Sequence, residues 1–124
     1  MNIALIIARE GSKRIKNKNI KFFFGKPIIA YSIETALRSK IFNRVIVSTE
    51  SEKIATISKK YGAEIAFKRP KKLADDKTST INVIKHAIKK LSYKKKKLTG
   101  LELTYQSICR FKMGFYEFCT NTKI

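Results

Sequence analysis

The sequence predicts an α/β fold of three layers, in which helices cover both faces of a mostly parallel sheet. Short apolar runs of strand length alternate with longer segments whose apolar residues recur every three or four positions. The order is strand, loop, helix, strand, helix, strand, helix, which is typical of parallel sheets with right-handed crossovers. A chain of 124 residues, 44% of them hydrophobic, is long enough for one domain with its own core.

Three segments are expected to form the strands of this sheet. Residues 3–8 are a continuous apolar run, as in a parallel strand that is buried on both faces. Residues 44–49 and 64–67 are expected to form the second and third strands. Ligands of such sheets bind beyond the carboxyl ends of the strands. We therefore expect the functional site in two loops, at residues 9–21 and 69–80.

Three segments show helical periodicity. The first follows Pro27, which suits the start of a helix. The second is expected from Ser51, as its N-terminal cap, to Tyr61, with Gly62 at its C-terminal stop. The third follows Thr80. The residues expected on the inner faces, helix by helix, are Ile29, Ile33 and Leu37; Ile54, Ile57 and Tyr61; and Ile81, Ile84, Ala87, Ile88 and Leu91.

The charge balance is strongly basic, with 28 Lys and Arg against 9 acidic residues and a net charge of +19. Such a balance favours an anionic partner, although the excess is nearly all lysine and is spread along the chain, as composition bias would also produce. Cys109 and Cys119 have no CxxC partner or histidine cluster nearby, so we expect neither a zinc site nor a disulfide framework. Without a signal peptide or a membrane-spanning apolar stretch, a cytoplasmic protein is expected.

The loop after the first strand has the composition of a phosphate-binding loop. Gly11 is expected to let the backbone turn tightly, so that successive N–H groups converge on an oxyanion, and Ser12 adds a hydroxyl. Positive charge comes from Arg9, Lys13, Arg14 and Lys18. A solvated basic turn is the alternative on these residues alone. Neither GxGxxG nor GxxxxGK[ST] occurs, which argues against a dinucleotide site and a P-loop.

Several motifs in one register carry a family resemblance. Residues 8–20 read Ala-Arg-Glu-Gly-Ser-Lys-Arg-Ile-Lys-Asn-Lys-Asn-Ile, and Gly-Lys-Pro follows at residues 25–27. Further matching segments lie at residues 28–34, 45–49 and 69–76, with Thr-Ser-Thr at 78–80. From residue 2 to about 91 the chain resembles acylneuraminate cytidylyltransferases (CMP-sialic acid synthetases), most closely the pseudaminic-acid branch.

This resemblance implies a Rossmann-like nucleotide-diphospho-sugar transferase fold, incomplete at its C-terminal side. It implies that CTP and a free nonulosonic acid react to give the CMP-sugar and pyrophosphate, with Mg²⁺ assistance. By family position, Lys18 and Arg9 are the expected catalytic residues, and Lys18 stabilises charge on the phosphates. The resemblance implies contacts to the phosphates and ribose from Arg9, Gly11, Ser12, Lys18 and Asn19, and contacts to the cytosine and ribose from Arg69, Thr78, Ser79 and Thr80.

The chain also departs from the family pattern. Glu10 replaces a usual glycine, and its carboxylate and Cβ are expected to disfavour a triphosphate and the tight turn; Lys16 replaces a usual proline. Residues 1–91 are interpreted as the N-terminal CTP-binding part, and residues 92–124 as a divergent tail, out of frame or poorly ordered. The metal-holding aspartates and the dimerisation element of the homodimeric family are not recognisable. We therefore expect a truncated chain with poor solubility and no turnover.

Two alternatives stay open. A small basic nucleic-acid-binding protein would explain the net charge of +19, although no helix-turn-helix, RRM or zinc pattern is recognisable. A related nucleotidyltransferase acting on another sugar, such as manno-octulosonate, would share the loop at residues 9–21. The expected partners are CTP and a nonulosonic acid, without nucleic acid or membrane. Preference for CTP over DNA would separate the first alternative from the family reading.

Overall fold

The computed structural model describes residues 2–92 and the backbone of residues 101–104. Cys109 and Cys119, the lysine run at 94–97 and most of the predicted tail lie outside the described residues. The helices are α1 (Ile28–Ser39), α2 (Glu52–Lys60) and α3 (Thr80–Ser92). The strands are β1 (Ile3–Ile7), β2 (Phe22–Phe23), β3 (Lys26–Pro27), β4 (Arg44–Ser48) and β5 (Leu101–Thr104), and single 3-10 turns form at Lys18–Ile20 and Lys71–Leu73.

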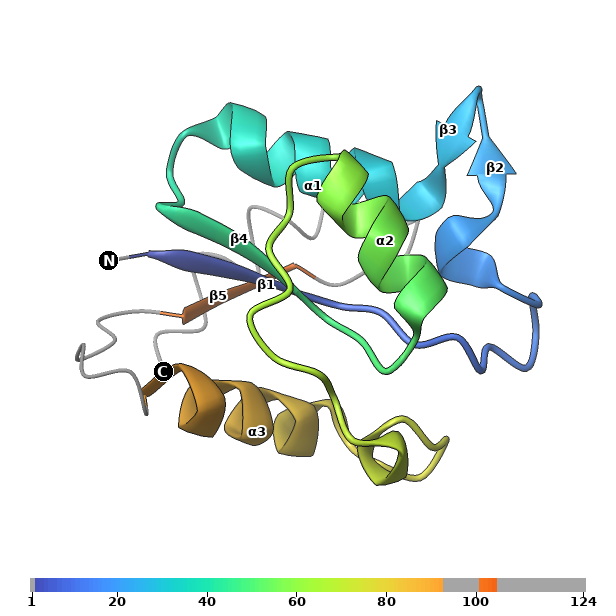
Figure 1. Cartoon of the computed structure of the whole chain (residues 1–124), viewed down its shortest axis with the longest axis vertical. Helices are drawn as coiled ribbons and strands as arrows, with labels where there is room; N and C mark the ends of the chain where they lie inside the picture. Colours follow the sequence, from blue (N-terminus) through green and yellow to red (C-terminus); the bar gives the residue numbers. More distant parts are fainter. Residues whose placement is uncertain (1, 93–100, 105–124) are drawn as a thin grey trace.

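The main sheet is parallel, with β1 between β4 and β5 (Figure 1). The register of β1 and β4 runs from Ile3 opposite Arg44 to Ile7 opposite Ser48. The predicted α/β class and parallel sheet are confirmed. The backbone of β5 lies parallel to β1 although the sequence predicted no strand after the lysine run. The division at residue 92 stays a prediction.

Alternate residues of β1 point to opposite faces of the sheet, each covered by helices. Ala4 and Ile6 pack into a core with Ile29 and Ile33 of α1 and Ile54 of α2. On the other face, another core lies under α3 and contains Ile3, Leu5, Ile46, Ile84, Ala87 and Leu91. Figure 1 shows α1 and α2 on one side of the strands and α3 on the other. The predicted three-layer arrangement is therefore confirmed, and it explains why residues 3–6 are completely buried.

Two residues predicted for the inner helix faces are wrong. Leu37 is 43% exposed and Ala36 is buried in its place. The buried face of α1 is therefore shifted by one residue at this end of the helix. Ile81 is 61% exposed, because it lies in the first turn of α3 at the margin of the stripe, and Val83 is buried instead. Burial of Ile54 and partial burial of Ile57 and Tyr61 confirm the predicted face of α2.

The third predicted strand, residues 64–67, is reduced to one parallel bridge between Glu64 and Ile46. Glu64 N donates to Val45 O at 2.8 Å and Glu64 O accepts from Val47 N at 2.9 Å, but beyond Glu64 the next backbone hydrogen bond to this neighbour is from Arg69 N to Thr49 O at 3.1 Å. The bonded positions are thus five residues apart on one side, at 64 and 69, and four apart on the other, at 45 and 49. The extra residue interrupts the ladder, as in a bulge. The prediction of a regular strand is wrong for this reason.

The predicted ends of α2 are correct only in part. Ser51 stands at the N-terminal cap position, but its side chain makes no capping hydrogen bond; its N–H instead donates to Thr49 Oγ1 at 3.1 Å. Gly62 has φ of 92°, in the left-handed region that glycine adopts without strain, which confirms its predicted role as the helix stop.

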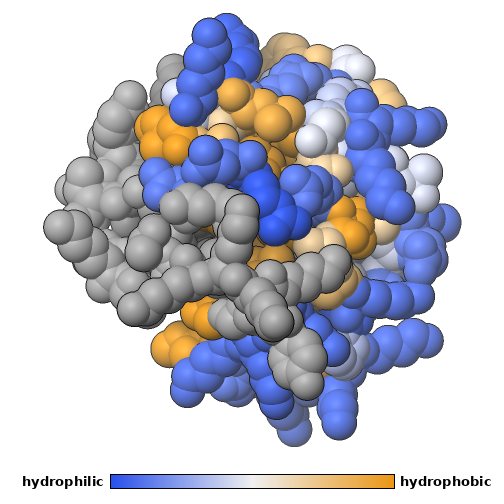
Figure 2. All heavy atoms as spheres, turned by 60° about the vertical axis from the view of Figure 1, so that its left-hand side comes forward, coloured by the Kyte–Doolittle hydropathy of each residue, from blue (hydrophilic) through white to orange (hydrophobic). Residues whose placement is uncertain are grey.

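Hydrophilic side chains cover much of the face shown in Figure 2, with smaller apolar patches between them. Two phenylalanines of the β2–β3 hairpin are strongly exposed: Phe22 in β2 at 70% and Phe24 in the turn at 87%. None of the helices in residues 2–92 is long and apolar enough to span a membrane.

Candidate functional site

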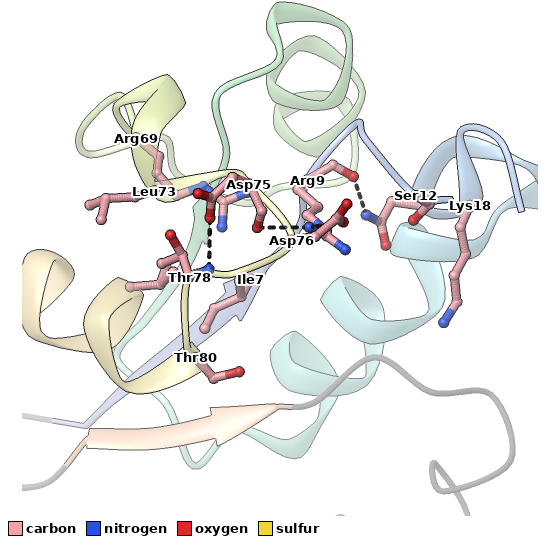
Figure 3. A pocket seen from close by; sticks show the side chains of 12 residues that line it. Ile7, Arg9, Ser12, Lys18, Arg69, Leu73, Asp75, Asp76, Thr78 and Thr80 are labelled. Atoms are coloured by element: carbon pink, nitrogen blue, oxygen red, sulfur yellow. Dashed lines mark hydrogen bonds and ion pairs between the residues drawn. The ribbon is translucent and has the colours of Figure 1, made fainter. Parts of the chain in front are cut away.

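A cavity of about 370 Å³ opens beyond the carboxyl end of β1. One side is formed by the loop that follows β1, and the other by the segment between residue 69 and the start of α3 (Figure 3). This is the position where parallel α/β sheets bind ligands. The two loops selected from the sequence do face each other. The lining residues are Ile7, Arg9, Ser12, Lys18, Asn19, Arg69, Leu73, Asp75, Asp76, Thr78, Thr80 and Val83.

Most of the residues predicted for the site line this one cavity. Gly11 and Ser79 are not among its lining residues. Ser79 lies at the start of α3, where its hydroxyl accepts a hydrogen bond from Asn82 N at 3.4 Å. Its position therefore suits capping of the helix. The predicted residues that the cavity brings together are Arg9, Ser12, Lys18, Asn19, Arg69, Thr78 and Thr80.

The backbone turns tightly at Gly11, as predicted, but the turn does not require a glycine. Gly11 does not adopt a left-handed φ, and a Cβ added there would meet no heavy atom within 4 Å. Gly11 is the central residue of a three-residue turn in which Ser12 N donates to Glu10 O at 2.8 Å. Glu10 is not among the left-handed residues either, so its Cβ does not strain the turn, and it does not line the cavity.

Asn19, Glu50 and Arg69 make a set of largely buried polar contacts; Asn19 and Arg69 line the cavity, and Glu50 binds Arg69. Arg69 NH2 donates both to Glu50 Oε2 at 2.7 Å and to Ala8 O at 2.9 Å. The side chains of Arg69 and Glu50 are only 1% and 12% exposed. Asn19 Nδ2 donates to Arg9 O at 2.8 Å. These three residues, called the base below, join the ends of β1 and β4 to the segment at residue 69.

Glu50 is the residue of the base that sequence reasoning missed. Its Oε1 accepts a hydrogen bond from Glu10 N at 2.8 Å, while its other oxygen binds Arg69. A signal was present in the sequence. Glu50 is one of only nine acidic residues and follows the second strand directly, at the edge of the sheet where sites form.

Asp75 and Asp76, which line the cavity, and the exposed Lys13, which pairs with Asp76, are called the rim below. Asp76 forms ion pairs with Arg9 NH1 at 2.8 Å and with Lys13 Nζ at 2.5 Å. Arg9 NH1 also donates to Asp75 O at 2.8 Å. Figure 3 shows Asp75 and Asp76 beside Arg9, while Ser12 and Lys18 lie further along the same loop. Both aspartates lie in the matching segment at residues 69–76, but the sequence predicted no role for them.

The two rim carboxylates are stabilised in their charged form. The hydrogen bond from Lys13, together with the charges of Lys13 and Arg9, holds the pKa of Asp76 below its usual value. Hydrogen bonds from Thr78, including one from its N–H to Asp75 Oδ1 at 2.7 Å, lower the pKa of Asp75. Both groups are therefore anionic at neutral pH. An anionic ligand that reaches Arg9 and Lys13 has to compete with Asp76.

The described residues do not supply a metal-binding cluster. In residues 2–92 no group of three or more His, Cys, Asp or Glu side chains is arranged to hold a metal ion. Asp75 and Asp76 are engaged by Thr78, Arg9 and Lys13. These residues do not fit a Mg²⁺ ion held by protein ligands alone, and we assign none of them to it.

Comparison with known proteins decides the family. A family model described as cytidylyltransferase matches residues 3–98. The chain belongs to this cytidylyltransferase family. The recognition made from the motifs at residues 8–20 and 69–80 is thereby confirmed. The cavity lies within the matched region.

The curated relatives support the same family and are longer than this chain. The chain is 51% identical over 87 residues to a pseudaminic acid cytidylyltransferase of Campylobacter jejuni, covering 70% of this chain and 38% of the relative. It is 48% identical over 92 residues to a Helicobacter pylori protein named pseudaminic acid cytidylyltransferase and UDP-2,4-diacetamido-2,4,6-trideoxy-beta-L-altropyranose hydrolase, covering 74% and 18%. An N-acylneuraminate cytidylyltransferase of Escherichia coli is 49% identical over 86 residues, covering 69% and 20%.

A solved structure supports the fold. The structure of CMP:2-keto-3-deoxy-manno-octonic acid synthetase complexed with CTP matches with a TM-score of 0.62 and 24% identity. The match covers 72% of this chain and 35% of the other. The Rossmann-like nucleotidyltransferase fold predicted from the resemblance is therefore confirmed.

Proposed function

We propose that this chain is the CTP-binding part of a cytidylyltransferase that activates a nonulosonic acid of the sialic or pseudaminic type. The observation that carries this proposal is the convergence of Arg9, Ser12, Lys18, Thr78 and Thr80 on one cavity at the carboxyl end of β1. The relatives at 48–51% identity bear the names of enzymes with this chemistry. In the proposed reaction the anomeric hydroxyl oxygen bonds to the α-phosphorus of CTP and gives up its proton to solvent, while the bond from the α-phosphorus to the oxygen bridging to the β-phosphate breaks and pyrophosphate leaves.

The proposed roles follow the two sides of the cavity. Arg9, Ser12 and Lys18 come from the loop after β1 and are proposed to bind the phosphates, where cations and a hydroxyl donor offset negative charge. Thr78 and Thr80 come from the opposite side and are proposed to bind the nucleoside. Lys18 is the proposed stabiliser of charge that develops on the departing pyrophosphate.

Mg²⁺ is a proposed cofactor that would bind through the oxygens of the nucleotide phosphates and water, as Mg²⁺ does in many nucleotide sites. No chemical step is assigned to it, because the described residues contain no three-ligand cluster. The cytoplasm, where CTP is available, is the proposed location. The homodimer implied by the family resemblance stays a prediction.

Nonulosonic acids are favoured over manno-octulosonate because the curated relatives named for them share 45–51% identity with this chain. The likeness to the synthetase of 2-keto-3-deoxy-manno-octonic acid, at 24% identity, concerns the fold alone. A nucleic-acid partner is less favoured, because the family model that matches residues 3–98 and the relatives at 48–51% identity are cytidylyltransferases.

Isothermal titration with CTP, UTP, ATP and a DNA duplex tests the proposal. We expect saturable CTP binding that Arg9→Ala weakens by about tenfold or more, since a charge-assisted contact is lost. Arg38→Ala is the matched control, because Arg38 is exposed on α1 and does not line the cavity, and it should leave CTP binding unchanged. Tighter binding of DNA than of CTP would contradict the proposal.

A pyrophosphate-release assay tests whether the chain carries out the transfer reaction as well as binding CTP. The chain spans 38% or less of the first curated relatives that it matches. We expect CTP and a nonulosonic acid to give no turnover with these 124 residues. Clear turnover would contradict this expectation and would place the complete reaction within this chain.

A further inference from the structure

The proposed contacts to the nucleotide do not explain the position of Glu50. It lies two residues after the end of β4, and its side chain is 12% exposed. Each of its oxygens accepts a hydrogen bond from a different part of the chain: Oε1 from Glu10 N at 2.8 Å and Oε2 from Arg69 NH2 at 2.7 Å. Arg69 in turn donates to Ala8 O at 2.9 Å.

These contacts hold the backbone on both sides of Arg9. The carbonyl before it, of Ala8, accepts from Arg69, and the N–H after it, of Glu10, donates to Glu50. The carbonyl of Arg9 itself accepts from Asn19 Nδ2 at 2.8 Å. Side chains therefore bind three of the four N–H and C=O groups in the two peptide bonds that flank Arg9, and the Arg9 side chain extends to Asp76.

We infer that Glu50 is a positioning residue of the nucleotide site, acting with Arg69 to orient Arg9 toward the phosphates of the ligand. This inference rests on the proposed function, since it assumes that Arg9 binds phosphate. It changes the role expected for Arg69, whose NH2 group is committed to Glu50 and Ala8 at the base. Because their charges cancel, the pair can orient Arg9 without altering the net charge of the cavity.

The chemistry requires a carboxylate at this position. Both oxygens of Glu50 face donors, an amide N–H and a guanidinium. Glutamine has the same shape but only one oxygen, so its NH2 group would face one of these donors. Glu50→Gln therefore breaks the contact to Glu10 or to Arg69 while it adds no bulk.

The experiment compares Glu50→Gln with Glu52→Gln and follows CTP and cytidine binding by NMR titration of the whole chain. Glu52 is a matched control: it undergoes the same change two residues away, and it pairs with Lys68 on the surface, with side chains 78% and 68% exposed. We expect Glu50→Gln to weaken CTP binding about tenfold, as loss of a charged hydrogen bond does. Cytidine, which lacks phosphates, should bind as before, and Glu52→Gln should change neither affinity.

The outcomes separate positioning from a merely structural role. Equal CTP affinity of Glu50→Gln and the unaltered chain would overturn the inference, and so would a proportional loss of CTP and cytidine binding. If the unaltered chain binds neither CTP nor cytidine, the proposed function is contradicted, and this inference falls with it. Should Glu50→Gln not fold, as judged by circular dichroism, Glu50→Asp keeps the charge beside Arg69 but shortens the reach. CTP affinity equal to that of the unaltered chain would then overturn the inference.

Discussion

The base and the rim of the cavity are both built from ion pairs, but they differ in burial. At the base, Arg69 and Glu50 are 1% and 12% exposed, and their contacts join three segments of the backbone. At the rim, Lys13 and Asp76 are 80% and 34% exposed. Water screens the rim pair and can replace either partner, whereas the base pair has no such substitute. The difference indicates that the base sets geometry and the rim is available for exchange with a ligand.

The largest effect is expected at the base, on stability. Arg69→Ala leaves the buried Glu50 carboxylate without its partner, which costs about 3 kcal/mol in comparable buried pairs. Lys68→Ala, the adjacent residue, breaks only the exposed pair with Glu52 and should leave the urea midpoint unchanged. Urea denaturation followed by circular dichroism measures both variants. Equal midpoints for the two variants would remove the distinction between buried and exposed pairs.

A smaller effect is expected at the rim, on binding. Asp76→Asn removes the charge that competes with a triphosphate for Arg9 and Lys13. CTP affinity should therefore rise by about threefold in buffer without divalent cations, consistent with the small energies of exposed pairs. Isothermal titration measures the change, and the urea midpoint should stay the same. A fall in affinity would show that Asp76 supports the ligand instead of competing with it.

The smallest effect is expected on the pKa of Asp76 at the rim. The pKa of Asp76 lies below its usual value because the ionised form is stabilised, first by Lys13 and then by Arg9. A lowered pKa in the folded state means that this stabilisation is present above pH 3.8, the ordinary value, and is lost as the pH falls through the folded pKa. Lys13→Ala should move the midpoint of Asp76 upward, measured from its carboxyl ¹³C shift. An unchanged midpoint would contradict the assigned ion pair.

Local sequence patterns predicted the α/β fold and the residues on one side of the cavity. The apolar run at residues 3–8 indicated a strand buried on both faces, and the loop after it supplied Arg9, Ser12 and Lys18. Each of these inferences depends on neighbouring residues, so periodicity and composition suffice. The helix stop at Gly62 was predictable for the same reason.

What the sequence did not predict depends on contacts between distant segments. The bond from Glu50 to Glu10 spans 40 residues, and that from Arg69 to Ala8 spans 61. The bulge after Glu64 depends on its register against β4, which no local pattern records. Pairs of this kind form only when the sheet brings the segments together, so Glu50 and the irregular third strand became visible only in the structure.

The central claim is that CTP binds between the loop after β1 and the segment before α3. Titration of CTP into ¹⁵N-labelled chain, followed by ¹H–¹⁵N correlation spectra, tests this most directly. The account predicts saturable shifts of the amides at residues 9–12 and 78–80, with the amides of the exposed residues Lys53 and Lys60 on α2 unmoved. Shifts that follow the surface lysines of α2 while the cavity amides stay in place would contradict it.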